Sequence, residues 1–314
     1  MSIAKAKLYY GTTSGYSAVA RLTIAEKGYG DDEIEWKEVD MAAAENYNPA
    51  YLRINPFGTV PALVIPLEKT LHDSEVKYKA LTDSRPIVEF LDKSRSVRSK
   101  THTTSEAPAP VLMPATISHL DTSNRIIDAM NNPWMGVYSF ACRTEDALEK
   151  FAGSIGGARV QGRYEGLLRA IREQDEIGLP PKVVPTLEAR RDNYFEIVKA
   201  MEAIRLAKAT RTPEQQAVID NYIAKSDAHW TESLPKQLAI FEKEIVGPFS
   251  LGDQVSIADV YLAVYITRLV VILGGDGTPG SVAKVPGVGP KLTAFWEAFI
   301  QRPSWQKVYG KQPF

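Results

Sequence analysis

The sequence predicts an α/β domain followed by an all-α domain, and three observations carry this prediction. Strand-like and helix-like apolar patterns alternate over roughly the first 95 residues. A polar, proline-bearing stretch comes next, and from about residue 115 onward the apolar residues recur mostly at helical spacing. We therefore divide the chain into an α/β domain at 1–94, a linker at 95–115 and an all-α domain at 116–314.

The first domain begins with a strand at 5–10 that ends at Gly11, and a helix at 17–27 that stops at Gly28. The alternation of apolar and polar residues at 33–39 is typical of a strand. The remaining elements are a short helix at 49–54, strands at 61–65 and 76–81, and a helix at 83–93. The order β-α-β-α-β-β-α predicts a mixed sheet with helical crossovers.

The second domain shows helical spacing over five segments. These are 116–150, 186–209, 213–246, 257–273 and 290–302. Ser256 and Asp259, at the start of the segment 257–273, closely match a capping box. We interpret this pair as a device that starts the helix and has no role in chemistry. Residues 151–184 are less regular and glycine-bearing, and we interpret them as an insertion.

Composition excludes several classes of function. The chain has 314 residues, 37 basic and 38 acidic, so no basic surplus favours nucleic acid or an anionic membrane. The single cysteine, Cys142, rules out a disulfide within the chain and argues against a cysteine-based zinc site. No apolar run has the length of a signal peptide or a membrane span. We expect a cytoplasmic protein with no metal and no bound cofactor.

The stretch INPFGTVPALV at 54–64 places Pro61 at the start of an apolar strand. Proline is confined to strand starts, edges and bulges because it cannot donate to the sheet. One interpretation is an edge strand. The other is a cis peptide bond before Pro61, which would turn the chain and leave the backbone of Val60 facing outward, where it could pair with an extended peptide ligand.

Two further turns lie between a strand and a helix. Asp83 and Ser84 either cap the following helix or, together with its N-terminus, hold the zwitterionic end of an amino-acid-like ligand. The hydroxyl-rich loop within residues 9–28 is either a simple cap or a site where a bound thiolate is stabilised by the helix dipole and backbone N–H groups.

The order of these motifs resembles that of the cytosolic glutathione transferases. NPFGTVPAL and TDSRPIVEFLD are similar to the family motifs NPxGxVPxL and (E/D)SxAIxxYL. The resemblance covers residues 5–94 well and about 235–310 fairly, whereas 95–185 match poorly. It implies a thioredoxin-like first domain, an all-helical C-terminal bundle and a homodimer, with glutathione as substrate.

The resemblance also implies roles for individual residues. The backbone of Val60, before a cis proline, would pair with the cysteinyl part of glutathione, and Thr59 is a further candidate contact. Asp83 and Ser84 would hold the γ-glutamyl end. The family's basic contact to the glycyl carboxylate has Arg53 as its nearest counterpart.

Gly28 corresponds to the glycine that ends the family's first helix. When the chain is aligned with the family from that glycine without gaps, Ser14 falls where serine-type classes carry their catalytic serine and cysteine-type classes their cysteine. Tyr10 falls where tyrosine-type classes carry their catalytic tyrosine. Ser17 and Thr13 are further alternatives. Gly15 departs from the family, which usually carries a proline nearby, and this leaves the assignment among the four hydroxyls open.

The implied activity is activation of the glutathione thiol for attack on a hydrophobic electrophile bound between the two domains, a detoxification reaction. The expected hydrophobic site comprises Tyr16, Met130, Trp134, Met135 and Tyr138. Two rival interpretations stay open. Thiol–disulfide or dehydroascorbate reduction would need a cysteine at position 14, and a non-catalytic ligand-binding or regulatory protein would keep the fold without turnover.

Overall fold

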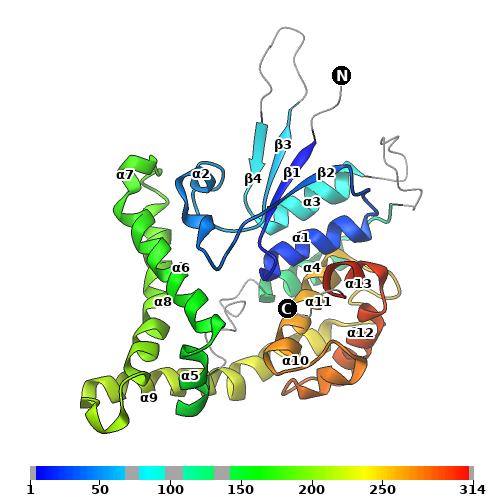
Figure 1. Cartoon of the computed structure of the whole chain (residues 1–314). Coiled ribbons are helices and arrows are strands. Elements are labelled where there is room, and N and C mark those ends of the chain that lie inside the picture. Colours follow the sequence, from blue (N-terminus) through cyan, green and yellow to red (C-terminus); the bar gives the residue numbers. More distant parts are fainter. Residues whose placement is uncertain (1–4, 68–77, 96–108, 131–141, 311–314) are drawn as a thin grey trace. The chain divides into compact units, whose positions relative to one another are not determined.

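The computed structural model describes residues 5–67, 78–95, 109–130 and 142–310 (Figure 1). Its contacts group the chain into two compact units. The first contains residues 1–38, 60–135 and 234–314, and the second contains 39–59 and 136–233. Each unit therefore holds residues from both predicted domains, and the predicted boundaries at 94 and 116 stay a prediction.

A four-stranded sheet lies in the first unit. It contains β1 (Ala6–Tyr10), β2 (Ile34–Glu38), β3 (Ala62–Pro66) and β4 (Tyr78–Leu81), in the order β2-β1-β3-β4. Strand β1 pairs parallel with β2 and antiparallel with β3, which pairs antiparallel with β4. The predicted mixed sheet is confirmed. The edge-strand interpretation of Pro61 is wrong, because β3 has a hydrogen-bonded neighbour on each side.

Helices α1 (Gly15–Glu26) and α3 (Ser84–Ser94) pack side by side on one face of this sheet. The apolar residues that alternate along the strands meet the apolar stripes of the two helices there. The buried cluster consists of Leu8, Ala20, Ile24, Ile34, Leu63, Ile87 and Leu91. Burial of these side chains, at about 1.5–3 kcal/mol for each large one, holds the strands and helices in register.

Most side chains of α11 (Ile257–Ile272) are buried among the other helices of the first unit. Helix α11 packs against α1 and α4. The others are α4 (Ile117–Met130), α10 (Leu234–Glu244), the 3₁₀ helix η5 (Pro279–Lys284), α12 (Pro290–Ile300) and α13 (Pro303–Tyr309). None of the helices in the described ranges is long and apolar enough to cross a membrane.

The predicted start of α11 is confirmed. The buried Asp259 carboxylate accepts hydrogen bonds from the Ser256 amide and hydroxyl, both at 2.7 Å, and from the Ser250 amide at 2.6 Å. These contacts satisfy backbone groups that an apolar helix start would otherwise bury unpaired. The pair is a folding device, as the sequence indicated.

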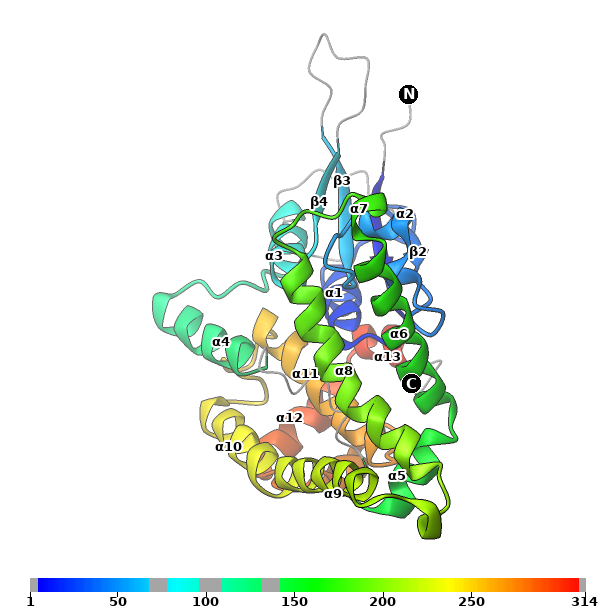
Figure 2. The same cartoon turned by 90° about the vertical axis from the view of Figure 1, so that its left-hand side faces the viewer.

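The second unit is helical in the parts that the structure describes. It contains η1 (Glu45–Tyr47), α2 (Pro49–Leu52), α5 (Glu145–Ala152), α6 (Ile155–Arg172), α7 (Gln174–Ile177), α8 (Val184–Ile204), η3 (Lys208–Thr210), α9 (Pro213–Ala228) and the π-helical turn His229–Ser233. Helices α6 and α8 lie side by side in both views (Figures 1 and 2). Ala44, Tyr47 and Leu52 from the segment after β2 share a buried cluster with Leu167 and Leu187 of these helices.

Helix α6 corrects the interpretation of residues 151–184 as irregular. The segment is mostly helical, and its glycines serve close packing. A Cβ on Gly166 would lie 2.6 Å from the Ala44 Cβ, and one on Gly157 would lie 2.4 Å from the Phe151 carbonyl oxygen. Such distances are too short for any other residue. Glycine weakens a helix by about 1 kcal/mol, and here it permits contacts that a larger residue would block.

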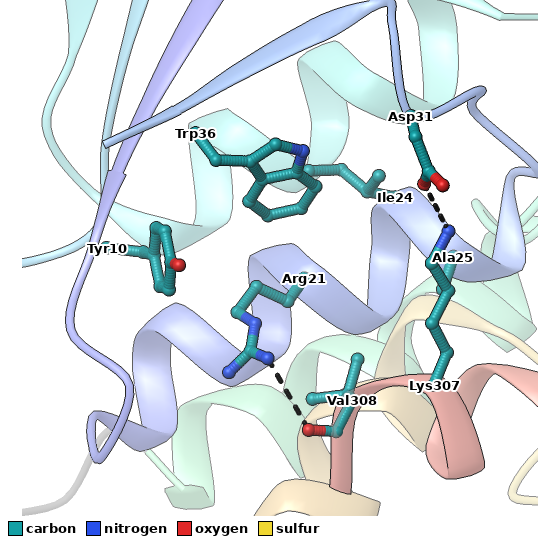
Figure 3. Close-up of a pocket in the computed structure, with 8 residues that line it drawn as sticks. All are labelled: Tyr10, Arg21, Ile24, Ala25, Asp31, Trp36, Lys307 and Val308. Carbon is teal, nitrogen blue, oxygen red and sulfur yellow. Dashed lines mark hydrogen bonds and ion pairs between the residues drawn. The ribbon is translucent and has the colours of Figure 1, made fainter. Parts of the chain in front are cut away.

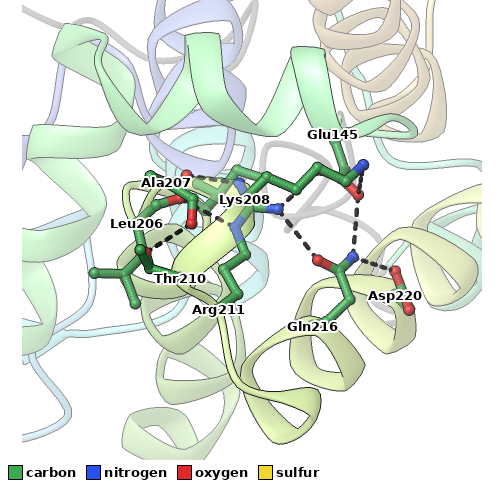
Figure 4. Close-up of polar contacts among 9 residues, drawn as sticks. Glu145, Leu206, Ala207, Lys208, Thr210, Arg211, Gln216 and Asp220 are labelled. Atoms are coloured by element: carbon green, nitrogen blue, oxygen red, sulfur yellow. Dashed lines mark hydrogen bonds and ion pairs between the residues drawn. The ribbon is translucent and has the colours of Figure 1, made fainter.

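A polar cluster joins the first turn of α5 to the end of α8 and the start of α9 (Figure 4). The Arg211 guanidinium donates to the Glu145 carboxylate at 2.9 Å and to the Ile204 carbonyl at 3.1 Å. The Gln216 amide donates to Glu145 at 3.0 Å and to Asp220 at 2.8 Å. The cluster lowers the pKa of Glu145, mainly through its hydrogen bond to Arg211.

His229 should make the stability of the protein depend on pH. Its side chain is only 2% exposed, and burial lowers its pKa from 6.5 to about 4. The unfolded chain therefore binds a proton between pH 6.5 and 4 that the native state does not, so stability falls as the pH drops through this range. We expect the free energy of unfolding to decrease by about 1–2 kcal/mol between pH 7 and 5 on this account.

Urea titrations at the two pH values measure this loss in the wild type and in His229→Gln, which should show a smaller loss. His119→Gln is the matched control, because His119 is exposed. An equal pH dependence in wild type and His229→Gln would contradict the prediction.

Candidate functional site

The register of the sheet brings three chain segments to one end of it. Tyr9 near the end of β1 lies opposite Ala62 at the start of β3. Leu63 lies opposite Leu81 at the end of β4. Because β3 is antiparallel to both neighbours, the loop after β1, the turn before β3 and the turn after β4 meet at the same end of the sheet. These segments carry Ser14, Val60 and Asp83.

Ser14 is the N-cap of α1 and is half-exposed. Its hydroxyl oxygen accepts a hydrogen bond from the Ser17 amide at 3.3 Å. A hydroxyl has one proton to donate besides its acceptor lone pairs. As the cap of α1, the Ser14 oxygen only accepts a hydrogen bond. The hydroxyl proton can therefore be donated to an anion at the helix N-terminus.

The Val60–Pro61 peptide bond is cis, as the second interpretation of the sequence predicted. It directly precedes β3. The turn before it, residues 55–59, belongs to the second unit and is stabilised by its own hydrogen bonds. The Asn55 side-chain amide donates to the Thr59 carbonyl at 2.7 Å and to the Thr59 hydroxyl at 2.8 Å. Arg53, exposed at the end of α2, also belongs to that unit. The roles of Thr59 and Arg53 stay predictions.

Asp83 and Ser84 form the start of α3. One Asp83 carboxylate oxygen accepts from the Arg85 amide at 3.0 Å, so the predicted cap is present. The second oxygen of this exposed carboxylate is not used by the cap. The buried Ser84 hydroxyl shares a hydrogen bond of 2.8 Å with the Tyr261 hydroxyl of α11. Burial raises the pKa of Tyr261, which keeps the phenol neutral.

Tyr16 lies within the electrostatic influence of this turn. Burial is the largest cause of the raised pKa of its phenol, followed by the Asp83 carboxylate, whereas the Arg268 guanidinium acts in the opposite direction. Tyr16 was predicted to line the hydrophobic site. The phenol is therefore affected by burial and by two charges, and its place in the hydrophobic site stays a prediction.

The N-termini of two helices, α1 and α3, lie at this end of the sheet. Each exposes backbone N–H groups and carries a partial positive charge. Asp83 supplies a negative charge beside the second. The site can therefore hold a ligand that carries anionic groups and an ammonium group.

The other hydroxyl candidates are placed differently. Tyr10 packs edge-to-face on Trp36, with ring centroids 5.6 Å apart, and lies under the Arg21 guanidinium. The Ser17 hydroxyl is fully buried and accepts from the Gly11 amide at 3.1 Å. Thr13 is exposed in the loop. Of the four, Ser14 best combines access with a position at a helix N-terminus.

The predicted hydrophobic residues of α4 are only partly described. Met130 is 1% exposed and therefore packed in the interior. Trp134, Met135 and Tyr138 lie outside the described residues. Cys142 is buried in the second unit, and burial raises the pKa of its thiol to about 11, so it is not an activated nucleophile. The described residues hold no group of three or more His, Cys, Asp or Glu side chains that could bind a metal.

Sequence reasoning missed Tyr261 and Arg268. Both lie on α11, more than 170 positions after Ser84. The capping box correctly predicted where α11 begins, and hence that Tyr261 lies one turn into it. No pattern in the sequence indicated that this turn packs against the start of α3.

Comparison with protein families gives two matches. The glutathione S-transferase N-terminal domain matches residues 13–94, and the glutathione S-transferase C-terminal domain matches residues 185–298. Together they span well over half of the chain, and the matched segments carry the cis proline and the Asp83–Ser84 turn. The chain belongs to the cytosolic glutathione transferase superfamily.

Two solved structures agree with this chain on the fold. The chain is similar to the β-etherase LigF from Sphingobium sp. strain SYK-6, with 18% identity, coverage of 98% of this chain and 100% of that one, and a TM-score of 0.54. It is also similar to the trimeric glutathione transferase TDR1 of Leishmania, with 15% identity, coverage of 96% and 45%, and a TM-score of 0.51. A Sulfitobacter glutathione transferase homolog with bound glutathione has 19% identity, coverage of 99% and 100%, and a TM-score of 0.49.

Proposed function

We propose that this protein is a serine-type glutathione transferase that activates the thiol of glutathione for attack on a small hydrophobic electrophile. The observation that carries the proposal is Ser14 at the N-cap of α1, half-exposed, with its hydroxyl proton uncommitted by the cap. It stands at the same end of the sheet as the cis Val60–Pro61 bond and the Asp83–Ser84 turn. Family membership supports glutathione as the ligand.

In the proposed complex, the Val60 backbone pairs with the cysteinyl part of glutathione. The γ-glutamyl carboxylate lies at the N-terminus of α3, where Ser84 and the backbone N–H groups receive it. Its ammonium group lies against the free oxygen of Asp83. Tyr261 positions Ser84 through their shared hydrogen bond.

The thiol then lies at the N-terminus of α1. A free thiol has a pKa of about 8.5, so only a few per cent is thiolate at neutral pH. Donation from Ser14 and the partial charge of α1 favour the thiolate, and each unit by which the pKa falls corresponds to about 1.4 kcal/mol. The thiol proton passes to solvent, and the thiolate attacks the electrophilic carbon to form a carbon–sulfur bond. With a chloronitroaromatic, chloride then departs with the bonding electron pair. With an isothiocyanate, the thiolate adds to the central carbon, the nitrogen takes up a proton and no group leaves.

Turnover of 1-chloro-2,4-dinitrobenzene and of phenethyl isothiocyanate with glutathione tests the proposal. Saturable, glutathione-dependent conjugation supports it. Glutathione binding without conjugation of either electrophile would instead favour a non-catalytic ligand-binding or regulatory protein, the alternative that stays open. The homodimer and the cytoplasmic location implied by the family resemblance stay predictions.

Replacing Asp83 should weaken glutathione binding. Loss of a charge-assisted hydrogen bond to the ammonium group costs roughly 1.5–3 kcal/mol. Asp83→Ala removes both the charge and the cap of α3, whereas Asp83→Asn removes the charge and keeps a capping residue. Titration calorimetry should show both variants binding glutathione more weakly. If Asp83→Asn binds as tightly as the wild type, Asp83 is only a helix cap.

A further inference from the structure

A cavity of about 180 Å³ lies in the first unit, at the end of β1 and beside β2 (Figure 3). Its walls come from β1, β2, the turn before β2, α1 and α13. The lining residues are Tyr10, Arg21, Ile24, Ala25, Asp31, Trp36, Lys307 and Val308. Ser14, Val60, Asp83 and Ser84, the residues assigned to glutathione above, are not among them; of the four candidate hydroxyls only Tyr10 lines the cavity.

Two aromatic side chains form one wall of this cavity. Tyr10 and Trp36 meet edge-to-face, with an angle of 89° between their planes. Ile24 and Ala25 add apolar surface from α1. A cavity of roughly 150 Å³ holds a benzene molecule, so this one can accept a single aromatic ring with a small substituent. Aromatic pairs favour a further ring in an offset or edge-on position.

Arg21 gives the cavity a cation with unused donors. Its guanidinium lies 5.3 Å from the centre of the Tyr10 ring and makes one long hydrogen bond, 3.4 Å, to the Val308 carbonyl. A guanidinium has five N–H donors in a planar fork that matches a carboxylate. In the part of the chain that the structure describes, no carboxylate lies within ion-pair distance of Arg21. The unused donors point to an anionic ligand.

A weak ion pair lies at the solvent side of the cavity. Lys307 and Asp31 are 2.7 Å apart, but their side chains are 54% and 85% exposed. Exposed pairs of this kind contribute little and exchange partners readily. Lys307 is therefore a second cation within reach of a ligand, whereas the Asp31 charge opposes an anion. Removing the Lys307 charge should therefore weaken the binding of an anion, and removing the Asp31 charge should strengthen it.

The wall formed by α13 is fixed in place. Arg302 makes a bidentate ion pair with the buried Glu26 carboxylate of α1, with both distances at 2.7 Å, and Ser304 donates to the same carboxylate. The Trp305 indole donates to the Thr267 hydroxyl of α11 at 3.1 Å. These contacts hold α13 against α1 and α11, so the cavity is formed before any ligand arrives, as ligand sites usually are.

We propose that this cavity binds a small aromatic carboxylate. The ring lies against Tyr10 and Trp36, and the carboxylate takes the free donors of Arg21 with Lys307 at the opening. The site is independent of glutathione and of the proposed transferase activity.

Titration calorimetry with benzoate tests the proposal against two matched compounds. Benzamide keeps the shape and removes the charge, and it should bind at least tenfold more weakly. Cyclohexanecarboxylate keeps the charge and removes the aromatic ring, and it should bind several-fold more weakly. Equal binding of benzoate and benzamide, or no binding of benzoate at concentrations on the order of 10 mM, would overturn the proposal.

Three variants locate the site. Arg21→Gln should weaken benzoate binding about tenfold or more, and Asp31→Asn should strengthen it several-fold because it removes a like charge and frees Lys307. Arg125→Gln removes the same charge from an exposed pair with Glu244 that is not part of the cavity, and it should have no effect. Thermal unfolding confirms that each variant is folded.

Two outcomes of these titrations would place benzoate elsewhere. If Arg21→Gln and Arg125→Gln behave alike, the cavity is not the site. If saturating glutathione displaces benzoate, the anion occupies the glutathione site and the proposal fails. Unchanged benzoate affinity in the presence of glutathione supports it, whether or not the protein conjugates electrophiles.

Discussion

The Ser14→Ala variant is expected to lose about 10²–10³-fold of its glutathione-dependent turnover near neutral pH, the scale for removal of one donor that stabilises a developing anion. Glutathione affinity should change little, because Val60, Asp83 and Ser84 still hold the peptide in the proposed complex. The loss should therefore appear in kcat, while KM for glutathione stays close to the wild-type value. Steady-state kinetics with a chloronitroaromatic measure both.

The pH–rate profile separates thiol activation from a structural effect. Without the Ser14 hydroxyl the bound thiol keeps a higher pKa, so the rate of the variant should climb with pH further than that of the wild type. Tyr10→Phe and Thr13→Ala should leave the profile nearly unchanged. If Tyr10→Phe shows the behaviour expected of Ser14→Ala while Ser14→Ala is silent, the protein belongs to the tyrosine type.

The helix cap needs its own control. Ser14→Ala removes an N-cap, which costs about 1 kcal/mol of stability. Ser154→Ala removes the N-cap of α6, where the serine oxygen accepts from the Gly157 amide at 3.2 Å and the hydroxyl donates to the Phe151 carbonyl at 2.7 Å. Ser154→Ala should lose at least as much stability in urea as Ser14→Ala, and only Ser14→Ala should lose turnover. A matching loss of turnover in Ser154→Ala would show that stability, not thiol activation, limits the reaction.

The Asp92→Ala variant is expected to lose about 3–5 kcal/mol of stability, the usual result of leaving a buried charge without its partner. Lys27 and Asp92 form an ion pair of 2.9 Å in which the side chains are 1% and 4% exposed. The Lys27 ammonium also donates to the Pro110 carbonyl. Asp92 accepts from the Leu112 and Met113 amides at 2.9 and 3.1 Å, so it ties the chain after residue 108 to α3.

Equilibrium unfolding in urea measures this loss, with Glu196→Ala as the control. Glu196 pairs with Lys225 at 2.8 Å, but both side chains are 58% exposed, so its removal should have a much smaller effect. The double variant Lys27→Met, Asp92→Leu should recover part of the stability, because no buried charge is left unpaired, while the Leu112 and Met113 amides and the Pro110 carbonyl lose these partners. A loss below about 1 kcal/mol in Asp92→Ala would mean that water reaches Lys27.

Local signals predicted the framework that positions the proposed glutathione site. The alternation at 33–39, the glycine after residue 27 and the capping residues before α3 and α11 act over a few positions, so their consequences can be predicted without the fold. The same holds for Pro61, which is confirmed as the second residue of a cis bond. The helices within residues 151–184 were missed because the glycines there interrupt the helical pattern when their neighbours are unknown, and the interpretation of the segment as an insertion stays a prediction.

The sequence by itself determined the order of the strands and helices in the first 95 residues, the helical character of the later chain and the three turns that carry Ser14, Val60 and Asp83. Only the tertiary structure decided that Tyr261 contacts Ser84, that residues 39–59 pack with α6 and α8, and that Arg21, Trp36 and Lys307 line one cavity. The reason is physical. Backbone propensity and apolar periodicity depend on neighbouring residues in the chain. These contacts join residues far apart in the chain, which come together only because the buried faces of their helices and strands pack against one another.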